Sequence, residues 1–472
     1  MKAVSKISNN LNGEIVCPGD KSISQRSVIL GSLLDTDIKI SGFLFAEDPL
    51  STINAMRSLG NNIEIQDETV VIKNSEKSKV IKKVFCNLGN SGTGMRLIAG
   101  LIAGQKLNVE LSGDESLSSR PMGRIIEPLI KMGAKIESND GCAPLVFSES
   151  ILLDEFHFKM PIASAQVKSC LLLAALTSNM KLTLIEETVS RDHTERMLKH
   201  FGTDIDIVAG TSIGAQVIRL NQDVIPKRFG SSNVERKDSP PVYERNGARY
   251  ISYGSSSDMR VYDVPGDFSS ASFLIVAALI TKNSSIKIKN VGINHTRSAL
   301  INILREMGGK IKVKNQDYRF DEEVADIEVH SSDLNGITIE EQAIPKIIDE
   351  IPILSIAASF AKGDTVIKGV GELRFKESDR LEAILQGLAN LGINSMSMPR
   401  YNDITIFGNE NLKINEDVNI KSFGDHRIAM SFLVAGLRSD AKIYVDDCKN
   451  IDTSFPSFFE TFSSLGADIK TI

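Results

Sequence analysis

The sequence predicts an α/β protein with two similar domains, each built from three repeated units. The first observation is that an apolar residue followed by Gly recurs six times at the predicted end of an amphipathic helix, at Leu59-Gly60, Met132-Gly133, Phe201-Gly202, Met307-Gly308, Leu391-Gly392 and Leu465-Gly466. Gly directly after a helix is the usual C-terminal cap. Successive glycines are 73, 69, 106, 84 and 74 residues apart. Four of these intervals indicate a repeat of 69–84 residues, and the interval of 106 residues is longer than the others.

Each repeat also contains a strongly apolar first helix, which is the second observation. These helices are predicted at residues 26–34, 94–103, 166–176, 270–280, 351–361 and 427–437. A short β-rich strand follows each of them, as at 37–40 and 108–111, and two further strands follow the second helix. A single unit would leave a helix face and a sheet face exposed to water, so the units are expected to pack on one another.

The third observation is the long interval, which contains a polar stretch between residues 222 and 260. Pro226-Lys227-Arg228-Phe229-Gly230, Ser239-Pro240-Pro241 and Gly254-Ser255-Ser256-Ser257 punctuate it. This pattern predicts an exposed inserted loop near 227–260. Three units precede the loop and three follow it, so we expect two domains with a ligand-binding cleft between them.

Composition excludes several classes of partner. The chain has 472 residues and a net charge of −6, so its surface as a whole does not favour nucleic acid or an anionic membrane. The five cysteines are far apart and form no C-x-x-C pair, which indicates a reducing compartment and argues against zinc. Residues 1–10 lack the apolar region of a signal peptide, and no apolar stretch is long enough to span a bilayer. A cytoplasmic protein is therefore expected.

Residues 18–26 place cations at the start of the first helix. Pro18-Gly19 forms a turn, and Lys21, Ser22 and Arg26 follow at or just inside the helix. Helix N-termini expose unpaired N–H groups and attract anions, and two cations strengthen that attraction. The alternative is a solvated basic turn.

The second unit shows two further anion-binding signals. Residues 87–96 combine three glycines with two hydroxyl side chains at a helix start, where Gly92 allows close approach to the backbone. Arg120 precedes Pro121, the predicted first residue of a helix, where a ligand carboxylate or phosphate would be a suitable partner. The alternatives are a tight turn at Gly92 and an ion pair from Arg120 to Asp114 or Glu115.

The third unit and the second half add polar groups at helix starts. Ser164 is a candidate N-cap, and Gln166 can donate and accept hydrogen bonds. Asp349 precedes an apolar helix and is either a base with a perturbed pKa or an ordinary N-terminal carboxylate.

Three cations complete the pattern in the second half. Lys376 and Arg380 are four residues apart and would share one helix face if the helix has begun by then; the alternative is a solvated turn. Arg427 opens a buried segment, where an unpaired charge is costly and a bound anion is expected. The cations at unit loops in both halves predict a ligand, or two ligands, with at least two anionic groups.

These motifs resemble those of the 5-enolpyruvylshikimate-3-phosphate (EPSP) synthase family, the 3-phosphoshikimate 1-carboxyvinyltransferases. The resemblance covers essentially the whole chain and rests on residues 18–26, 88–93, 120–122, 164–169, 265–270, 376–381 and 425–430. It implies six βαβαββ units, three per domain, in an inverse α/β barrel with the active site between the domains. It also implies domains of residues 19–264 and of residues 1–18 with 265–472, no cofactor, no metal, and a monomer that acts in the shikimate pathway.

The resemblance also implies roles for individual residues. The 3-phosphoshikimate site would consist of Lys21, Ser22, Arg26, Ser164, Gln166, Ser190, Asp349 and Lys376. The phosphoenolpyruvate site would consist of Lys21, Gly92, Arg120, Gln166, Arg380 and Arg427. Asp349 would accept the proton of the 5-hydroxyl, and Glu377 and Lys21 are candidates for protonating the methylene carbon. Lys21 and Arg427 would stabilise the departing phosphate.

Two other functions remain open at this point. The sister transferase that acts on UDP-N-acetylglucosamine uses a Cys in a loop near residues 113–124, where this chain has none. A non-catalytic binder of anionic metabolites would not need Asp349 and Glu377 among the cations.

The chain departs from the EPSP synthase pattern at one position. Some members of that family carry a Lys near the C-terminal Phe-Pro where this chain has Thr453. Since that family is the target of glyphosate, inhibition by glyphosate is expected.

Overall fold

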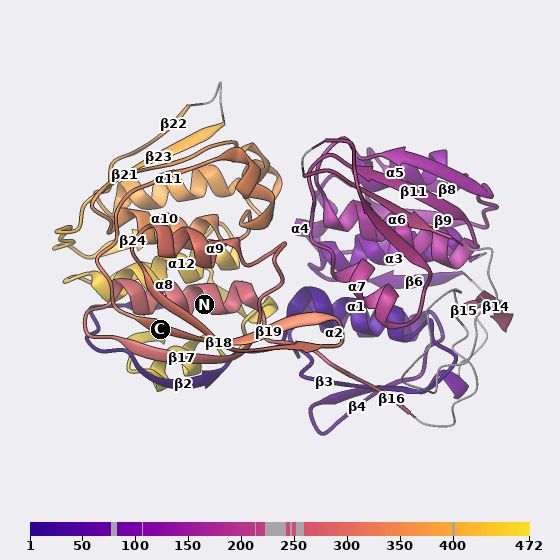
Figure 1. Cartoon of the computed structure of the whole chain (residues 1–472), viewed down its shortest axis with the longest axis horizontal. Helices are drawn as coiled ribbons and strands as arrows, with labels where there is room; N and C mark the ends of the chain where they lie inside the picture. The colour runs from indigo at the N-terminus through magenta and orange to yellow at the C-terminus, as the bar shows by residue number, and fades with distance from the viewer. Residues whose placement is uncertain are drawn as a thin grey trace. The chain divides into compact units, whose positions relative to one another are not determined.

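The computed structural model describes residues 1–76, 83–105, 107–212, 214–221, 242–245, 248–251, 259–398 and 402–472, with only the backbone described for 242–245 and 248–251. The chain divides into two compact domains (Figure 1). We call residues 20–264 the N-terminal domain, and residues 1–19 with 265–472 the C-terminal domain. The division falls after Gly19 on the first pass of the chain and before Pro265 on the second.

The described part of the N-terminal domain contains three four-stranded sheets, with strand orders β16-β3-β5-β4, β6-β7-β9-β8 and β10-β11-β13-β12. The strands are β3 (Ile38–Ser41), β4 (Ile63–Gln66), β5 (Thr69–Ile72), β6 (Val84–Asn87), β7 (Val109–Ser112), β8 (Lys135–Asn139), β9 (Cys142–Ser148), β10 (Glu155–Lys159), β11 (Lys181–Glu186), β12 (Ile205–Ala209), β13 (Gln216–Leu220) and β16 (Arg260–Asp263). The helices are α1 (Lys21–Gly31), α2 (Glu47–Ser58), α3 (Gly92–Gly104), α4 (Glu115–Ser118), α5 (Gly123–Lys131), α6 (Ala165–Ser178) and α7 (His193–His200), with the 3₁₀ turn η1 (Asn74–Glu76).

The described part of the C-terminal domain also contains three four-stranded sheets, with strand orders β18-β19-β17-β2, β20-β21-β23-β22 and β24-β25-β1-β26. The strands are β1 (Ala3–Ser5), β2 (Asn12–Val16), β17 (Ser285–Gly292), β18 (Lys310–Arg319), β19 (Glu322–His330), β20 (Thr338–Ile339), β21 (Gly363–Ile367), β22 (Ser395–Met398), β23 (Asp403–Gly408), β24 (Val418–Ile420), β25 (Ile443–Val445) and β26 (Ile469–Thr471). The helices are α8 (Phe268–Ile280), α9 (Ala299–Glu306), α10 (Ile351–Ser359), α11 (Arg380–Asn390), α12 (His426–Ala435) and α13 (Phe458–Ser464). Four 3₁₀ segments join them: η2 (Glu341–Lys346), η3 (Gly371–Phe375), η4 (Gly436–Arg438) and η5 (Cys448–Thr453).

All six sheets share one pattern of pairing. The first and second strands of each repeat are parallel, and the fourth strand pairs antiparallel with both the second and the third. In four of the six sheets the first helix of the repeat, α3, α6, α10 or α12, connects the two parallel strands, since a parallel pair needs a crossover connection. The predicted α/β class with two similar domains of three βαβαββ repeats is therefore confirmed.

Three strands pair with strands that are distant from them in sequence. Strand β2, which directly precedes α1, pairs in parallel with β17, so that Asn12 faces Ser285. Strand β16, which directly precedes α8, instead pairs with β3 in the N-terminal domain, with Arg260 opposite Ile38. Strand β1 lies between β25 and β26 in the last sheet and takes the part of the fourth strand of that repeat. Each domain thus completes its repeats with a strand that the chain supplies out of order.

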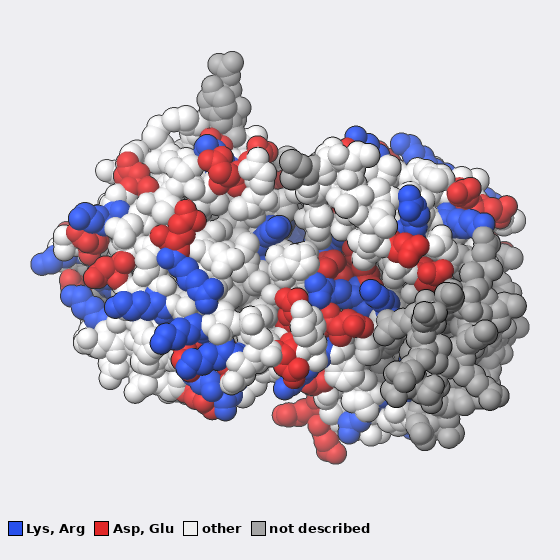
Figure 2. All heavy atoms as spheres, in the orientation of Figure 1, with Lys and Arg blue, Asp and Glu red and all other residues white. Residues whose placement is uncertain are grey.

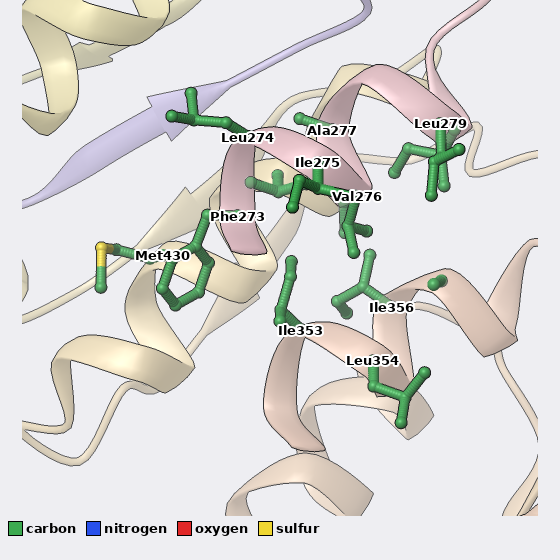
Figure 3. Packing of buried hydrophobic residues seen from close by; sticks show 14 of the residues in the cluster. Phe273, Leu274, Ile275, Val276, Ala277, Leu279, Ile353, Leu354, Ile356 and Met430 are labelled. Carbon is green, nitrogen blue, oxygen red and sulfur yellow. The ribbon is translucent and has the colours of Figure 1, made fainter. Parts of the chain in front are cut away.

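The first helices of the repeats form the centre of each domain. In the C-terminal domain α8, α10 and α12 contact one another, and all thirteen residues of α8 are buried. Figure 3 shows Ile353 and Ile356 of α10 pointing toward α8, with Met430 of α12 beside Phe273. Helices that are apolar on every side are buried helices, which explains why these segments read as continuous apolar runs in the sequence.

In the N-terminal domain, α3 packs closely against α6. A Cβ atom on Gly100 of α3 would lie 2.0 Å from the backbone oxygen of Cys170 in α6, so only glycine fits this contact. A Cβ on Gly104, one turn further along α3, would lie 2.0 Å from Thr177 Oγ1. The close approach of α3 and α6 brings their N-terminal turns together, and these turns carry candidate site residues.

Several predicted boundaries differ from the structure. Helix α1 begins at Lys21 rather than Arg26, because the Asp20 side chain accepts a hydrogen bond from the Ile23 amide at 2.8 Å and caps the helix earlier. Most of the inserted loop predicted near 227–260 lies outside the described residues. Within it the backbone of β14 (Val242–Arg245) pairs antiparallel with β15 (Ala248–Ile251). Among the described helices none is long and apolar enough to cross a membrane.

Candidate active site

Lys21 and Ser22 lie in the first turn of α1, as the sequence predicts. Lys21 Nζ lies 3.0 Å from Asp48 Oδ2 at the start of α2, and the two side chains are 15% and 12% exposed. Gln25, one turn further along α1, donates to Thr52 Oγ1 at 3.0 Å and to Ser91 Oγ at 2.5 Å. Ser91 is the N-cap of α3, so these bonds connect the starts of α1 and α3.

Arg26 is buried and reaches across to two other helices. Its Nε donates to Thr194 Oγ1 at 2.8 Å, and its Nη2 donates to Ser169 Oγ at 3.0 Å. Ser169 lies in the first turns of α6 and Thr194 in the first turn of α7. Arg26 therefore joins the second turn of α1 to the N-terminal turns of α6 and α7 inside the N-terminal domain.

Gly92 is the first residue of α3 and lies against two guanidinium groups. A Cβ at this position would lie 3.0 Å from Arg96 Nη1 and 3.3 Å from Arg120 Nη1. The small residue therefore leaves room directly beside two cations, where a ligand anion could reach the backbone.

The prediction that Arg120 stands at the start of a helix beginning with Pro121 is wrong. Helix α5 begins at Gly123, since the Met122 amide bonds to the Gly141 oxygen at 2.7 Å and Met122 takes the capping position. Arg120 donates instead to Asn90 Oδ1 at 2.5 Å and to Ser116 Oγ at 3.0 Å. In the described part of the chain Arg120 forms no ion pair with Asp114 or Glu115, so a cation held by neutral groups remains available to an anion.

Gln166 occupies the first turn of α6, which Ser164 caps by accepting a long hydrogen bond from the Val167 amide at 3.4 Å. Arg96 Nη1 donates to Gln166 Oε1 at 2.8 Å, and Gln166 Nε2 donates to Thr93 Oγ1 at 2.9 Å. These two bonds fix the orientation of the amide group. Arg96 is a candidate that the sequence analysis missed, although it stands in the same stretch as Gly92, one helical turn later.

Ser190 lies in the loop between β11 and α7 and is 5% exposed. Its hydroxyl donates to Glu186 Oε1 at 2.6 Å. The structure thus places Gly92, Arg120, Gln166 and Ser190 at or beside the starts of helices in the N-terminal domain, whereas Arg26 lies in the second turn of α1.

Asp349 is the centre of the candidate residues in the C-terminal domain. Its Oδ1 lies 3.1 Å from Arg380 Nη1 and 3.6 Å from Lys376 Nζ, and its Oδ2 lies 3.9 Å from Arg427 Nη2. The structure therefore brings the three candidate cations of this domain together around one carboxylate.

Lys376 and Arg380 do not share a helical face, because the helix has not yet begun at Lys376, which was the condition of that expectation. Helix α11 begins only at Arg380, because Asp379 caps it by accepting from the Glu382 amide at 3.0 Å. Lys376 has an extended backbone at the end of η3. The two cations still meet at Asp349 because the chain turns between them.

Arg380 is fully buried among three acidic side chains, Asp349, Glu377 and Asp425. Its Nε donates to Asp425 Oδ2 at 2.8 Å, and its Nη2 donates to Glu377 Oε2. Burial alone would lower the pKa of Arg380, but the three carboxylates outweigh burial and raise this pKa above its ordinary value. Asp425, which also caps α12, is a second candidate that the sequence analysis passed over within a motif it had singled out.

Arg427 lies in the first turn of α12 and is 8% exposed. Its Nη1 donates to the Asp349 backbone oxygen at 3.2 Å and lies 4.0 Å from Glu350 Oε1. Glu350 is fully buried and accepts a hydrogen bond of 2.5 Å from Ser269 Oγ. The helix starts of α8, α10 and α12 thus meet at this group of charges.

Charge outside these residues is mixed. Figure 2 shows Lys and Arg side chains interspersed with Asp and Glu over the face in view. No group of three or more His, Cys, Asp and Glu suited to a metal ion occurs among the described residues. The cations around Asp349 are consequently a local group within a surface of mixed charge.

The fold is that of the enolpyruvyl transferases. It matches the enolpyruvyl transferase NikO of Streptomyces tendae with a TM-score of 0.72 at 15% identity, covering 99% of this chain and 98% of that one. The chain belongs to the EPSP synthase (3-phosphoshikimate 1-carboxyvinyltransferase) family, whose model matches residues 5–220 and 241–462.

Similar proteins cover the whole chain. The 3-phosphoshikimate 1-carboxyvinyltransferase of Petrotoga mobilis is 42% identical over 469 residues, which are 98% of this chain and 99% of that protein. The solved EPSP synthase of Acinetobacter baumannii is 35% identical, with a TM-score of 0.79 and coverage of 100% of this chain and 99% of that one.

Proposed function

We propose that this protein transfers the carboxyvinyl group of phosphoenolpyruvate to the 5-hydroxyl of 3-phosphoshikimate and releases phosphate. The reaction would proceed by addition and elimination through a tetrahedral intermediate, as a step of the shikimate pathway. The single observation that carries the proposal is the group of Lys376, Arg380 and Arg427 around Asp349. A binder of anions needs the cations, whereas proton transfer from a hydroxyl needs the carboxylate.

The roles of the C-terminal domain follow from competition for its cations. In the described state these cations hold Asp349, and a phosphate or carboxylate of a substrate would compete for them. Asp349 would then be free to accept the proton of the 5-hydroxyl as the new C–O bond forms. In the addition step Glu377 would deliver a proton to the methylene carbon of phosphoenolpyruvate, with Lys21 as the other candidate donor. In the elimination step the same group would take a proton back from the resulting methyl carbon as the C–O bond to phosphate breaks. Arg380 and Arg427 would bind phosphoenolpyruvate, and Lys376 would bind 3-phosphoshikimate.

The roles of the N-terminal domain follow from its helix starts. Gly92, Arg120 and Gln166 would bind phosphoenolpyruvate, whose carboxylate and phosphate suit the forked geometry of arginine. Lys21, Ser22, Arg26, Ser164, Gln166 and Ser190 would bind 3-phosphoshikimate. Lys21 would also contact phosphoenolpyruvate and, together with Arg427, stabilise the negative charge that develops on the departing phosphate.

One assay separates this proposal from the two alternatives. Phosphate release from phosphoenolpyruvate is measured with 3-phosphoshikimate and, separately, with UDP-N-acetylglucosamine. We expect turnover with 3-phosphoshikimate alone. Turnover with the nucleotide sugar would favour the sister transferase, and binding of both anions without turnover would favour a non-catalytic binder.

We further propose that the protein acts in the cytoplasm as a monomer and needs neither metal nor organic cofactor. Size-exclusion chromatography with light scattering tests the monomer, and turnover after treatment with EDTA tests the metal. Glyphosate should inhibit the reaction, and an unchanged rate at millimolar glyphosate would contradict this expectation.

A further inference from the structure

Lys168 carries a fully buried ammonium group inside the N-terminal domain. It lies on α6, and its Nζ is 2.9 Å from Glu186 Oε2, 2.6 Å from Glu195 Oε1 and 3.3 Å from the Ser190 backbone oxygen. The side chains of Lys168, Glu186 and Glu195 are all 0% exposed. The ammonium donates hydrogen bonds to Glu186 and to the Ser190 oxygen, and Glu195 adds a second carboxyl group at ion-pair distance.

Glu186, the last residue of β11, connects this ammonium to Ser190. Its Oε1 accepts the hydrogen bond of 2.6 Å from the Ser190 hydroxyl, and its Oε2 accepts from Gln216 Nε2 at 2.6 Å as well as from Lys168. Ser190 is therefore held at two points, through its hydroxyl by Glu186 and through its backbone oxygen by Lys168.

Two carboxyl groups share this buried ammonium. Burial raises the pKa of Glu195, although the nearby Lys168 opposes this effect. Burial would lower the pKa of Lys168, but Glu195 and Glu186 outweigh it, and the pKa of Lys168 is raised. Lys168 therefore stays charged inside the domain.

Stability alone is a weak reason for such a cluster. A buried ion pair costs so much desolvation that apolar side chains of similar volume often serve a fold equally well or better. The neighbouring residues of α6 suggest a different reason, because Gln166 and the Arg26 partner Ser169 lie within two positions of Lys168. The cluster is thus built into the helix start that carries other candidate binding residues.

We propose that Glu186, itself held by Lys168, is a positioning residue that fixes the Ser190 hydroxyl for binding of 3-phosphoshikimate. This inference rests on the proposed function and on the proposed role of Ser190. A free serine samples three staggered side-chain conformations, and restricting it to one of them on binding costs conformational entropy. The bond to Glu186 selects the conformation before the ligand arrives. Because this bond uses the hydroxyl hydrogen, Ser190 Oγ would accept a hydrogen bond from a hydroxyl group of 3-phosphoshikimate.

The test is a double-mutant cycle that joins Glu186→Gln with Ser190→Ala. The dissociation constant of 3-phosphoshikimate is measured calorimetrically without phosphoenolpyruvate, so that catalysis does not enter. Each single variant should weaken binding about tenfold, and the double variant should bind no more weakly than Ser190→Ala alone. Glu187→Gln is the matched control, because Glu187 is the next residue and pairs on the surface with Lys159.

Lys168→Met extends the test, with Lys159→Met as its control. Lys159 is 65% exposed, and its variant should bind 3-phosphoshikimate like the wild type. Lys168→Met should weaken that binding about tenfold or more while the KM for phosphoenolpyruvate at saturating 3-phosphoshikimate stays within about twofold. If Lys168→Met fails to fold, the cycle at Glu186 still decides the question.

The outcomes separate the inference from the proposed function. Wild-type protein that does not bind 3-phosphoshikimate would overturn the proposed function. Wild-type binding together with an unchanged dissociation constant in Glu186→Gln, or with additive losses in the double variant, would overturn the positioning role alone. Equal rises in the KM of both substrates would indicate general loosening of the fold and would also overturn it.

Discussion

Arg380 Nη1 lies 3.1 Å from Asp349 Oδ1, and the arginine side chain is fully buried whereas that of the aspartate is 15% exposed. The pair therefore has a fixed side and an accessible side. Arg380 also has Asp425 and Glu377 as partners, so the arginine does not depend on Asp349 for its charge balance. In the proposed reaction Asp349 would change partners while Arg380 stays in place.

Asp349→Asn should nearly abolish turnover and leave the fold intact. The amide keeps the shape of the side chain but cannot accept the hydroxyl proton, so kcat should fall by about 10²–10⁴. Phosphate release measures turnover, and calorimetry should show substrate binding within about fivefold of wild type, since the three cations remain. Asp364→Asn, at an exposed position of β21, is the control. A kcat within a few-fold of wild type would remove Asp349 from the role of base.

Arg120→Lys should raise the KM for phosphoenolpyruvate about tenfold without changing that for 3-phosphoshikimate. Lysine keeps the charge but loses the planar fork that binds a carboxylate or phosphate at two points. Because the partners of Arg120 are the neutral side chains of Asn90 and Ser116, the substitution leaves no carboxylate without an ion-pair partner. Steady-state kinetics provide the measurement, with Arg124→Lys at an exposed site of α5 as the control. Wild-type kinetics would place Arg120 outside the site.

Gly92→Ala should impair phosphoenolpyruvate binding more than stability. The added methyl group would lie 3.0 Å from Arg96 Nη1 and 3.3 Å from Arg120 Nη1, which are the ends of flexible side chains and can move. Their movement should raise the KM for phosphoenolpyruvate several-fold and change the free energy of unfolding by less than about 1 kcal/mol. An unchanged KM would show that the space beside Gly92 is not used by this substrate.

Gly100→Ala should destabilise the N-terminal domain. Its Cβ would lie 2.0 Å from the Cys170 backbone oxygen, and a backbone oxygen cannot move aside without shifting α6 against α3. We expect a loss of about 1–3 kcal/mol or more in the free energy of unfolding, measured in urea. Gly123→Ala, whose Cβ would have no neighbour nearer than 3.6 Å, is the control. Equal stability of the two variants would contradict the close packing of α3 and α6.

Cysteine reactivity should separate this chain from a transferase that depends on a cysteine. Burial raises the pKa of the Cys86 and Cys448 thiols to about 12 and also raises that of Cys170. Native protein at pH 8 should therefore react rapidly with Ellman's reagent mainly at the partly exposed Cys142. Cys142→Ser should remove the rapid phase and keep full turnover. Loss of turnover in this variant would contradict the proposed mechanism.

The same thiols predict lower stability in alkali. The pKa of Cys86 is 9.0 when unperturbed and about 12 in the folded protein, so above pH 9 the unfolded chain binds fewer protons than the folded one. The free energy of unfolding should therefore fall as the pH rises from 9 to 12. Urea titrations across this range provide the measurement, and Cys86→Ala should reduce the slope.

Sequence reasoning succeeded where structure depends on local chemistry. The apolar-Gly pairs located the ends of the second helices, since Gly at a helix end answers a local need of the backbone. The apolar first helices were found because a helix that is buried on every side has no polar face. The group of cations at Asp349 was only partly predictable, because the meeting of Lys376 with Arg380 depends on a turn rather than on helical spacing.

Other features depend on contacts that no short stretch of sequence reveals. The start of α5 was misplaced because a bond to Gly141, far along the chain, sets the cap at Met122. Lys168 escaped notice because it stands alone in an apolar helix, while its partners Glu186 and Glu195 lie in other elements. A single charged residue within an otherwise apolar helix is the signal that could have found it.

The position of β1 in the last sheet constrains the order in which the two domains can fold during translation. Residues 20–264 contain every strand of the described N-terminal sheets, so this half can close as soon as β16 has left the exit tunnel. Residues 3–5 are translated long before their partners in β25 and β26. Strand β1 must therefore stay unpaired until these two strands have been made, and the last sheet of the C-terminal domain can form only then.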